Sequence, residues 1–266
     1  MTAGIAARRA GAGEVVPALA AAAALGPYFE IVTDPAEQAD PTWRRLPERD
    51  TGRLAGLVDA YAARLGTGER RVAASILFQG LAARLWSPVI VAAAHGVVPD
   101  LSGLHWRWAP GAPIALWLDA PSGWLPPPAP GRAAGPPRDI GTPHPPGASG
   151  ASGPVDPVGL AGLVHREVVE HQLRPLRETL LGIVRLADAL LWGNAASALA
   201  GTLRSAALDR GLAAPVRSVV GELMIREPLA GTGSFGREGF VRRSCCLYYR
   251  VPPGGEMCGD CALLRR

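Results

Sequence analysis

Apolar side chains recur every three or four positions along several stretches of the chain, which is the spacing of an amphipathic helix. In residues 53–65 this spacing joins Leu54, Leu57, Val58, Tyr61 and Leu65. Residues 68–96 are apolar on nearly every face. They predict a long buried helix that kinks or restarts at Pro88, because proline cannot donate a backbone hydrogen bond.

The first 29 residues carry an Ala-rich apolar run behind a basic dipeptide, which raises the question of a secretory signal. Glu14 and Pro17 interrupt the run, and no clear small-residue cleavage site follows it. We therefore expect an Ala-rich helix that starts near Pro17. No stretch approaches the roughly 20 apolar residues of a membrane span, so we expect a soluble, cytoplasmic chain.

In residues 104–118 the spacing of apolar side chains changes from the helical period to every second residue, the period of a strand. Leu104, Trp106 and Trp108 share one face of an extended segment, and Ile114, Leu116 and Leu118 share a face of the next. Residues 109–113 supply turn chemistry between the two segments. This alternation predicts a β-hairpin.

Residues 120–157 are dominated by Pro, Gly, Ser and Ala, and such a composition buries too little apolar surface to offset the entropy of ordering. They predict a linker or surface insert. Residues 160–192 and 194–208 then predict helices, followed by a shorter one near 215–225.

These elements predict a helix-rich α+β protein, a helical scaffold with a β-hairpin and a small cysteine-rich C-terminal module. The expected organisation is an N-terminal helical region with the hairpin at 1–119, the linker at 120–157, a helical region at 158–230 and the cysteine module at 231–266.

Charge and motifs exclude several classes of function. All 27 basic residues are Arg, and the net charge of +4, without a basic stripe interleaved with aromatics, gives no support for nucleic-acid binding. Phosphate-binding loops, dinucleotide fingerprints and serine-nucleophile motifs are missing. His165, Glu167, Glu170 and His171 resemble a metal cluster, but six positions separate the two histidines. A solvated helix face is the better interpretation, because zinc-binding helices use His at i and i+4.

The chain holds four cysteines, and all lie within its last 22 residues: Cys245, Cys246, Cys258 and Cys261. A disulfide, a structural zinc ion and an iron–sulfur cluster each account for such a group. A reducing compartment disfavours the disulfide. The turn chemistry of residues 252–255 predicts a fold-back that places residue 246 opposite 261 and brings both cysteine pairs into one site.

The spacing of the cysteines in the sequence distinguishes a zinc site from an iron–sulfur cluster only in part. Structural zinc usually takes two C-x₂₋₄-C knuckles, and only Cys258 and Cys261 follow that form. Adjacent side chains of an extended chain point to opposite faces, so Cys245 and Cys246 fit a wider two-iron cluster more easily. A C-x-x-C thiol redox motif normally opens a helix in a thioredoxin-like context, and this one lies near the end of the sequence.

The C-terminal residues resemble the C-terminal module of the FhuF-like ferric iron (ferric-siderophore) reductases, which carry a [2Fe–2S] cluster on a Cys-Cys…Cys-x-x-Cys motif. Residues 75–94 and 190–204 also look like the family's two helical blocks. The spacing between Cys246 and Cys258 is one residue longer than the family pattern.

The resemblance implies a cytoplasmic reductase that transfers one electron to a ferric siderophore, for example a hydroxamate chelate, and thereby releases Fe²⁺. It implies that the four cysteines bind a [2Fe–2S] cluster, and that a ferredoxin or flavoprotein reductase supplies the electrons. We expect Arg242, Arg243 and Arg250 to raise the cluster potential or to dock the substrate or donor. Trp86 and Trp192 are candidates for a siderophore cleft, although core packing is the simpler role for both.

Three alternatives remain open. An interaction protein with a C-terminal zinc knuckle would bind zinc instead of iron. A general [2Fe–2S] electron-transfer protein would carry the cluster but serve another acceptor. A siderophore-synthetase relative would need an ATP site, for which the sequence offers no candidate.

Overall fold

The structure is a computed structural model, and it describes residues 7–109, 112–127 and 156–265. The α-helices are α1 (Ala12–Ala23), α2 (Thr51–Arg64), α3 (Arg70–Ala94), α4 (Pro157–Val164), α5 (Arg174–Leu181), α6 (Asp188–Ala206) and α7 (Arg210–Met224). The strands are β1 (Arg8–Ala10), β2 (Arg44–Arg45), β3 (Val98–Pro99), β4 (Leu104–Arg107), β5 (Ala115–Leu118), β6 (Gly123–Leu125), β7 (Gly233–Gly236) and β8 (Gly239–Arg242). This helix-rich α+β fold confirms the predicted class.

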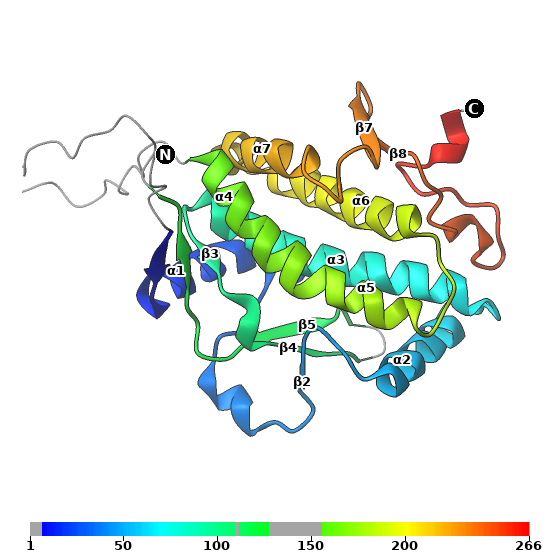
Figure 1. Cartoon of the computed structure of the whole chain (residues 1–266), viewed down its shortest axis with the longest axis horizontal. Coiled ribbons are helices and arrows are strands. Elements are labelled where there is room, and N and C mark those ends of the chain that lie inside the picture. Colours follow the sequence, from blue (N-terminus) through cyan, green and yellow to red (C-terminus); the bar gives the residue numbers. More distant parts are fainter. Residues whose placement is uncertain (1–6, 110–111, 128–155, 266) are drawn as a thin grey trace, which may run out of the picture.

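The core is built around α3, which packs against α6 and is also in contact with α1, α2 and α7 (Figure 1). Trp86 of α3 is fully buried and donates its indole N–H to the Ala195 carbonyl of α6 at 3.0 Å. One hydrophobic cluster runs from Ala10 to Phe240. The two predicted helical regions therefore contribute to a single core.

Several predicted helix boundaries differ from the structure. Helix α3 continues through Pro88 without restarting, and α1 begins at Ala12, so Pro17 lies inside it. The helix predicted over 160–192 ends at Leu181, and Leu190 to Trp192 belong to α6. Between α4 and α5 the chain forms a π-helix, His165–Leu173. Side-chain periodicity shows which stretches are helical, but it does not show where one helix ends.

Helix α3 is, within the described part of the chain, long and apolar enough to cross a membrane by length and composition, so the expectation that no stretch approaches a membrane span in apolar length is wrong. Its most apolar 18-residue segment is 78% buried inside the protein. Burial of this kind is also found in the core helices of soluble proteins, so the finding carries little weight for a membrane span.

The hairpin predicted for residues 104–118 is present as β4 and β5, which pair antiparallel with Leu104 opposite Leu118 and Trp106 opposite Leu116. Two turn residues, 110 and 111, lie outside the described residues. Strand β2 extends this sheet, and a second small sheet has the order β1-β6-β3.

The predicted linker is described only at its ends. Residues 123–125 form β6 between β1 and β3, and Pro157 begins α4, where Asp156 accepts a hydrogen bond from the Val158 amide. Residues 128–155, which include most of the Pro- and Gly-rich stretch, lie outside the described residues.

The C-terminal segment leaves α7, forms the β7–β8 hairpin and then runs beside α6 and α3 at one end of the helical layers (Figure 1). Strand β8 packs on α6, and the short 3-10 helix Tyr248–Arg250 packs on α3. The predicted cysteine module is thus attached directly to the two central helices of the core.

Candidate metal centre

The β7–β8 hairpin carries the chain into the cysteine segment. In β8 the side chains of Phe240 and Arg242 are buried, and that of Val241 between them is partly exposed, as the two-residue period of a strand requires. Phe240 joins the hydrophobic core. Arg242, the last residue of the strand, therefore enters the protein beside α6.

The segment that carries Cys245 and Cys246 is held by α3 and α6. Ser75 of α3 donates its hydroxyl to the Cys246 carbonyl at 2.6 Å, and Ser244 donates to the Ala189 carbonyl at 2.8 Å. A Cβ added to Gly193 would lie 2.2 Å from the Ser244 hydroxyl oxygen. Glycine at this point of α6 therefore allows the cysteine segment to approach the helix.

The second pair of cysteines lies on a tight turn. The amide of Cys261 donates to the carbonyl of Cys258 at 3.1 Å, and the backbone of Arg242 donates to the carbonyl of Asp260 at 3.2 Å. Upstream, Gly254 and Gly255 have φ values of 87° and 92°, which glycine adopts without steric strain. The predicted fold-back about residues 252–255 is confirmed.

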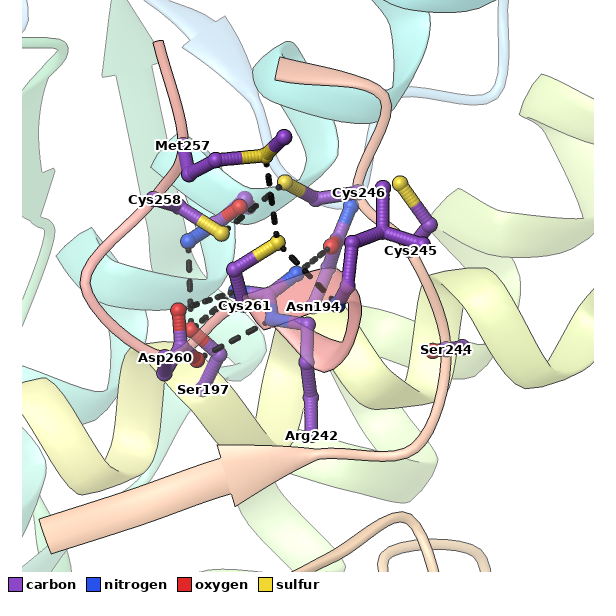
Figure 2. A network of polar contacts seen from close by, with 12 residues as sticks. Asn194, Ser197, Arg242, Ser244, Cys245, Cys246, Met257, Cys258, Asp260 and Cys261 are labelled. Carbon is purple, nitrogen blue, oxygen red and sulfur yellow. Dashed lines mark hydrogen bonds and ion pairs between the residues drawn. The ribbon is translucent and has the colours of Figure 1, made fainter. Parts of the chain in front are cut away.

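The fold-back gathers the thiols, but in a different register from the predicted one. The Cys246 sulfur lies 3.4 Å from that of Cys258 rather than opposite Cys261, and the Cys261 sulfur lies 3.6 Å from the Met257 sulfur. Figure 2 shows the sulfurs of Cys246, Cys258 and Cys261 facing one another, with that of Cys245 to the other side of the loop. The two adjacent cysteines diverge, as their sequence positions predict.

Arg242 connects both cysteine loops to the core. Its guanidinium pairs with Asp260 at 3.0 Å, donates to the Asn194 side-chain oxygen at 2.6 Å and also donates to the Ser197 hydroxyl (Figure 2). Its side chain is 0% exposed. A guanidinium so enclosed cannot contact a dissolved substrate or donor, so the docking role expected for Arg242 is corrected to a positioning role.

The buried network extends from Arg242 to α3. The fully buried Asn194 amide donates to both the carbonyl and the hydroxyl oxygen of Ser75 at 2.9 Å. Ser75 in turn holds the backbone of Cys246. An arginine on β8 and a serine on α3 are thereby linked through one asparagine, and the network fixes both cysteine loops relative to the two helices.

The electrostatics of this network favour thiolate at Cys246. Hydrogen bonding to Cys258 lowers the pKa of Cys246 to about 6, and the Arg242 guanidinium adds to that lowering while burial opposes it. The same sulfur pair raises the pKa of Cys258. Burial acts to raise the pKa of Asp260, but the charge and hydrogen bonds of Arg242 hold it below the usual value.

Two of the predicted arginines remain near the surface. Arg250 is partly exposed and forms an ion pair with Glu69, at the start of α3, at 2.7 Å. Arg243 is exposed, and its backbone N–H donates to the Thr232 carbonyl at 2.8 Å. Docking by these two residues stays a prediction.

The two tryptophans proposed for a cleft occupy the core. Trp86 is 0% and Trp192 is 4% exposed, which agrees with packing as their main role. The cleft beside the cysteines is lined by other residues. It reaches Cys258, Gly259 and Asp260 and is bounded on its other sides by α3, α6 and the 3-10 helix η1 (Pro27–Phe29).

The predicted solvated face on residues 165–171 is only partly correct. Glu167 is 1% exposed and accepts a hydrogen bond from the Leu101 amide at 3.2 Å, while His171 lies 3.3 Å from the same carboxylate. The π-helix brings Glu167 inward, a geometry that no helical wheel of standard period anticipates. The residue has a structural role at the start of the hairpin.

The donor set fits an iron–sulfur cluster in its chemistry. Four thiols on two neighbouring loops are the usual ligands of a [2Fe–2S] cluster. Among the described residues, no three His, Cys, Asp or Glu side chains close on a point suited to a single metal ion.

Sequence reasoning found the cysteines but missed the residues that hold them: Ser75, Gly193, Asn194, Ser197 and Asp260. Two signals were available. Phe240 and Arg242 share one face of a short strand, and an asparagine lies within the otherwise apolar small-residue stretch of 190–200.

Residues 242–263 match the family model of the FhuF 2Fe-2S C-terminal domain. The match begins at the buried arginine and includes all four cysteines. Comparison with curated proteins and with solved structures finds no match to this chain. The C-terminal segment is therefore an FhuF-type 2Fe-2S domain, and the resemblance predicted from the cysteine spacing is confirmed for it. The resemblance of the helical blocks at 75–94 and 190–204 lies outside the matched residues.

Proposed function

We propose that this protein is a ferric-siderophore reductase in which Cys245, Cys246, Cys258 and Cys261 bind a [2Fe–2S] cluster. The observation that carries the proposal is the match to an FhuF-type 2Fe-2S domain over all four cysteines, with the Cys246 and Cys258 sulfurs 3.4 Å apart and Cys258 at the border of a cleft. Such a family match is consistent with iron reductases associated with siderophores.

The chain's own residues favour metal binding at one of the thiols. Cysteine binds metal as the thiolate, and the lowered pKa of Cys246 favours that form, whereas the raised pKa of Cys258 disfavours it. The bound cluster would supply electrons one at a time. Arg242 places a buried positive charge beside the thiols, which favours the more negative, reduced state and so raises the reduction potential. Asp260, paired with the same guanidinium, limits this effect.

One electron suffices for the proposed reaction. A siderophore holds Fe³⁺ through hard oxygen donors, and iron that gains one electron becomes softer, less charged and less tightly held. The substrate is the ferric chelate, for example a hydroxamate, and the products are Fe²⁺ and the free chelator. No general acid or base is required by this electron balance.

We further propose that the protein acts in the cytoplasm and receives its electrons from a ferredoxin or flavoprotein reductase. Cys245 and Cys258 are partly exposed, which leaves short paths from the protein surface to the thiols. Arg243 and Arg250 lie near these cysteines in sequence and are exposed, so Arg243, together with Arg250 and its partner Glu69, offers a polar surface to a donor protein. Charge on such a surface steers association and makes its rate fall with ionic strength.

Single-turnover kinetics test the proposal. Cluster-loaded protein, chemically reduced and freed of excess reductant, is mixed anaerobically with a ferric hydroxamate and a ferrous-specific trap. We expect one Fe²⁺ to appear per electron lost by the protein, because the trap draws an uphill transfer forward. Protein that keeps its electron for minutes beside several ferric siderophores would refute the reductase function and leave a general electron-transfer role.

A further inference from the structure

A cleft of about 700 Å³ opens beside the C-x-x-C turn. Its volume lies within the range of about 300–1,000 Å³ that is typical of small-molecule sites. Three segments remote in sequence form its walls: residues 25–29, the face of α3 from Gln79 to Ser87, and the face of α6 from Ser197 to Ser205. Cys258, Gly259 and Asp260 form the fourth side, so one predicted metal ligand borders the space.

The wall that contains Tyr28 and Phe29 is fixed by a buried arginine. Arg84 of α3 is 3% exposed and donates to the carbonyls of Pro27 and Glu30 at 2.7 Å, and to that of Ile114 at 2.6 Å. Burial lowers the pKa of Arg84 to about 10, which leaves it charged at neutral pH. The contacts to Pro27 and Glu30 hold η1 against α3, while Tyr28, which lines the cleft, keeps 53% of its surface exposed.

The opposite wall is linked to the cysteines. Ser197 on α6 accepts hydrogen bonds from Gln79 at 3.3 Å and from Arg242, which also holds Asp260. A ligand that contacts Ser197 or Gln79 therefore lies against the same network that positions Cys258. An added Cβ on Gly259 would meet nothing within 4 Å, so the turn itself leaves space toward the cleft.

The cleft offers hydrogen bonds but no excess of positive charge. Its polar groups include the amide of Gln79 and the hydroxyls of Ser197 and Ser205. Arg204 lines it together with Asp209, and the charge of Asp260 is paired with Arg242. A polyanion bound here would lose its water without gaining a net countercharge, and this desolvation costs free energy. A chelate with zero or positive net charge would bind without that cost, with its polar surface on the hydroxyls and its apolar surface on the rings of η1.

We propose that this cleft is the binding site for the ferric chelate, and that its charge balance selects chelates without net negative charge. The proposal rests on the reductase function above and assigns the residues that receive its substrate. It places the chelate against the Cys258 turn, between η1 and α6.

Gallium(III) desferrioxamine B tests binding apart from reduction, because Ga³⁺ imitates the size and charge of Fe³⁺ but does not accept the electron. Gly201→Leu extends a side chain from α6 into the cleft, and an added Cβ there meets only the Arg204 guanidinium at 3.9 Å. Gly221→Leu is the matched control, because it makes the same change in the middle of α7 at an exposed position with open space. Ser205→Trp blocks the exposed rim and provides a second, independent obstruction.

Isothermal titration of cluster-loaded, oxidised protein should show that Gly201→Leu and Ser205→Trp each weaken binding of the gallium chelate at least tenfold. Gly221→Leu should bind as the unmodified protein does, and all variants should keep their iron content. Unchanged affinity in both blocking variants, or no binding to the unmodified protein, would overturn the cleft assignment. If the gallium chelate binds but reduced protein does not reduce the ferric one, the reductase function fails while the binding site stands.

The proposed selection by charge is tested by comparing a hydroxamate chelate with a catecholate chelate. Three hydroxamates neutralise a trivalent ion, whereas three catecholates leave a net charge of −3. The tris-catecholate complex of gallium should therefore bind at least tenfold more weakly than the hydroxamate complex, because its charge loses water in the cleft without a net countercharge. Equal affinity for the two would refute the selection by charge.

Discussion

Replacing Arg242 by Met should destabilise the protein far more than the same replacement at Arg243, its neighbour in sequence. Arg242 has a side chain that is 0% exposed and is paired with Asp260, whose side chain is 14% exposed. Arg243 is exposed. Removal of one partner from a buried ion pair leaves an uncompensated charge and typically costs about 3–5 kcal/mol. A surface substitution typically changes stability by no more than about 0.5 kcal/mol.

The larger figure is a considerable part of the total stability of a protein, which is about 5–15 kcal/mol. Arg242→Met also leaves the Asn194 side-chain oxygen without the hydrogen bond that it accepts at 2.6 Å. An unsatisfied buried acceptor of this kind costs about 1–3 kcal/mol. The two costs overlap because both arise from the same guanidinium, so we expect a total near the upper end of the ion-pair range.

Urea-induced unfolding, followed anaerobically by circular dichroism with and without bound iron, measures the difference. A double-mutant cycle with Asp260→Asn isolates the pair, and its coupling should fall within about 0.5–3 kcal/mol. Arg242→Met and Arg243→Met proteins that unfold at the same urea concentration would show that Arg242 does not anchor the cysteine loops. The positioning role derived from its contacts would then be wrong.

Three further results are expected. Each Cys→Ser replacement at positions 245, 246, 258 and 261 should sharply reduce the iron content of anaerobically purified protein. A variant that retains its full iron content would show that the replaced cysteine is not a ligand. Gly221→Ala should stabilise α7 by about 0.5–1 kcal/mol through helix propensity, whereas Gly193→Ala should gain less or lose, because its Cβ would fall 2.2 Å from the Ser244 hydroxyl oxygen. Equal unfolding midpoints for these two variants would show that Gly193 is not a close-approach position. Trypsin should cut first at Arg132 or Arg138, as the composition of residues 120–157 predicts, and protection of both sites would contradict the linker assignment.

The helical scaffold could be predicted because burial leaves a periodic record in the sequence. The spacing of Leu54, Leu57 and Val58 predicts α2, and the two-residue alternation in 104–118 predicts β4 and β5. The non-helical segment 182–187 between α5 and α6 could not be predicted from periodicity, because the residues on both sides of it are apolar and helix-forming. The π-helix was missed for a related reason: its wider turn buries Glu167, which was placed on a solvated face, while His171 stays exposed as predicted.

The cysteine ligands could be predicted because their chemistry is visible in the residue types themselves. The roles of Arg242 and Arg243 could not be separated in the same way, since two adjacent arginines look equivalent until a strand directs one inward and one outward. The cleft could not be predicted from the sequence, for another reason. Its walls come from residues near 25, 80, 200 and 260, which only the tertiary fold brings together.

Iron and acid-labile sulfide analysis of anaerobically purified protein, combined with a visible spectrum, tests the central claim most directly. Ligation by the four cysteines predicts about two irons and two sulfides per chain and a red-brown protein, as a [2Fe–2S] cluster requires. Stoichiometric zinc and no sulfide, in colourless protein from iron-replete cells, would contradict it.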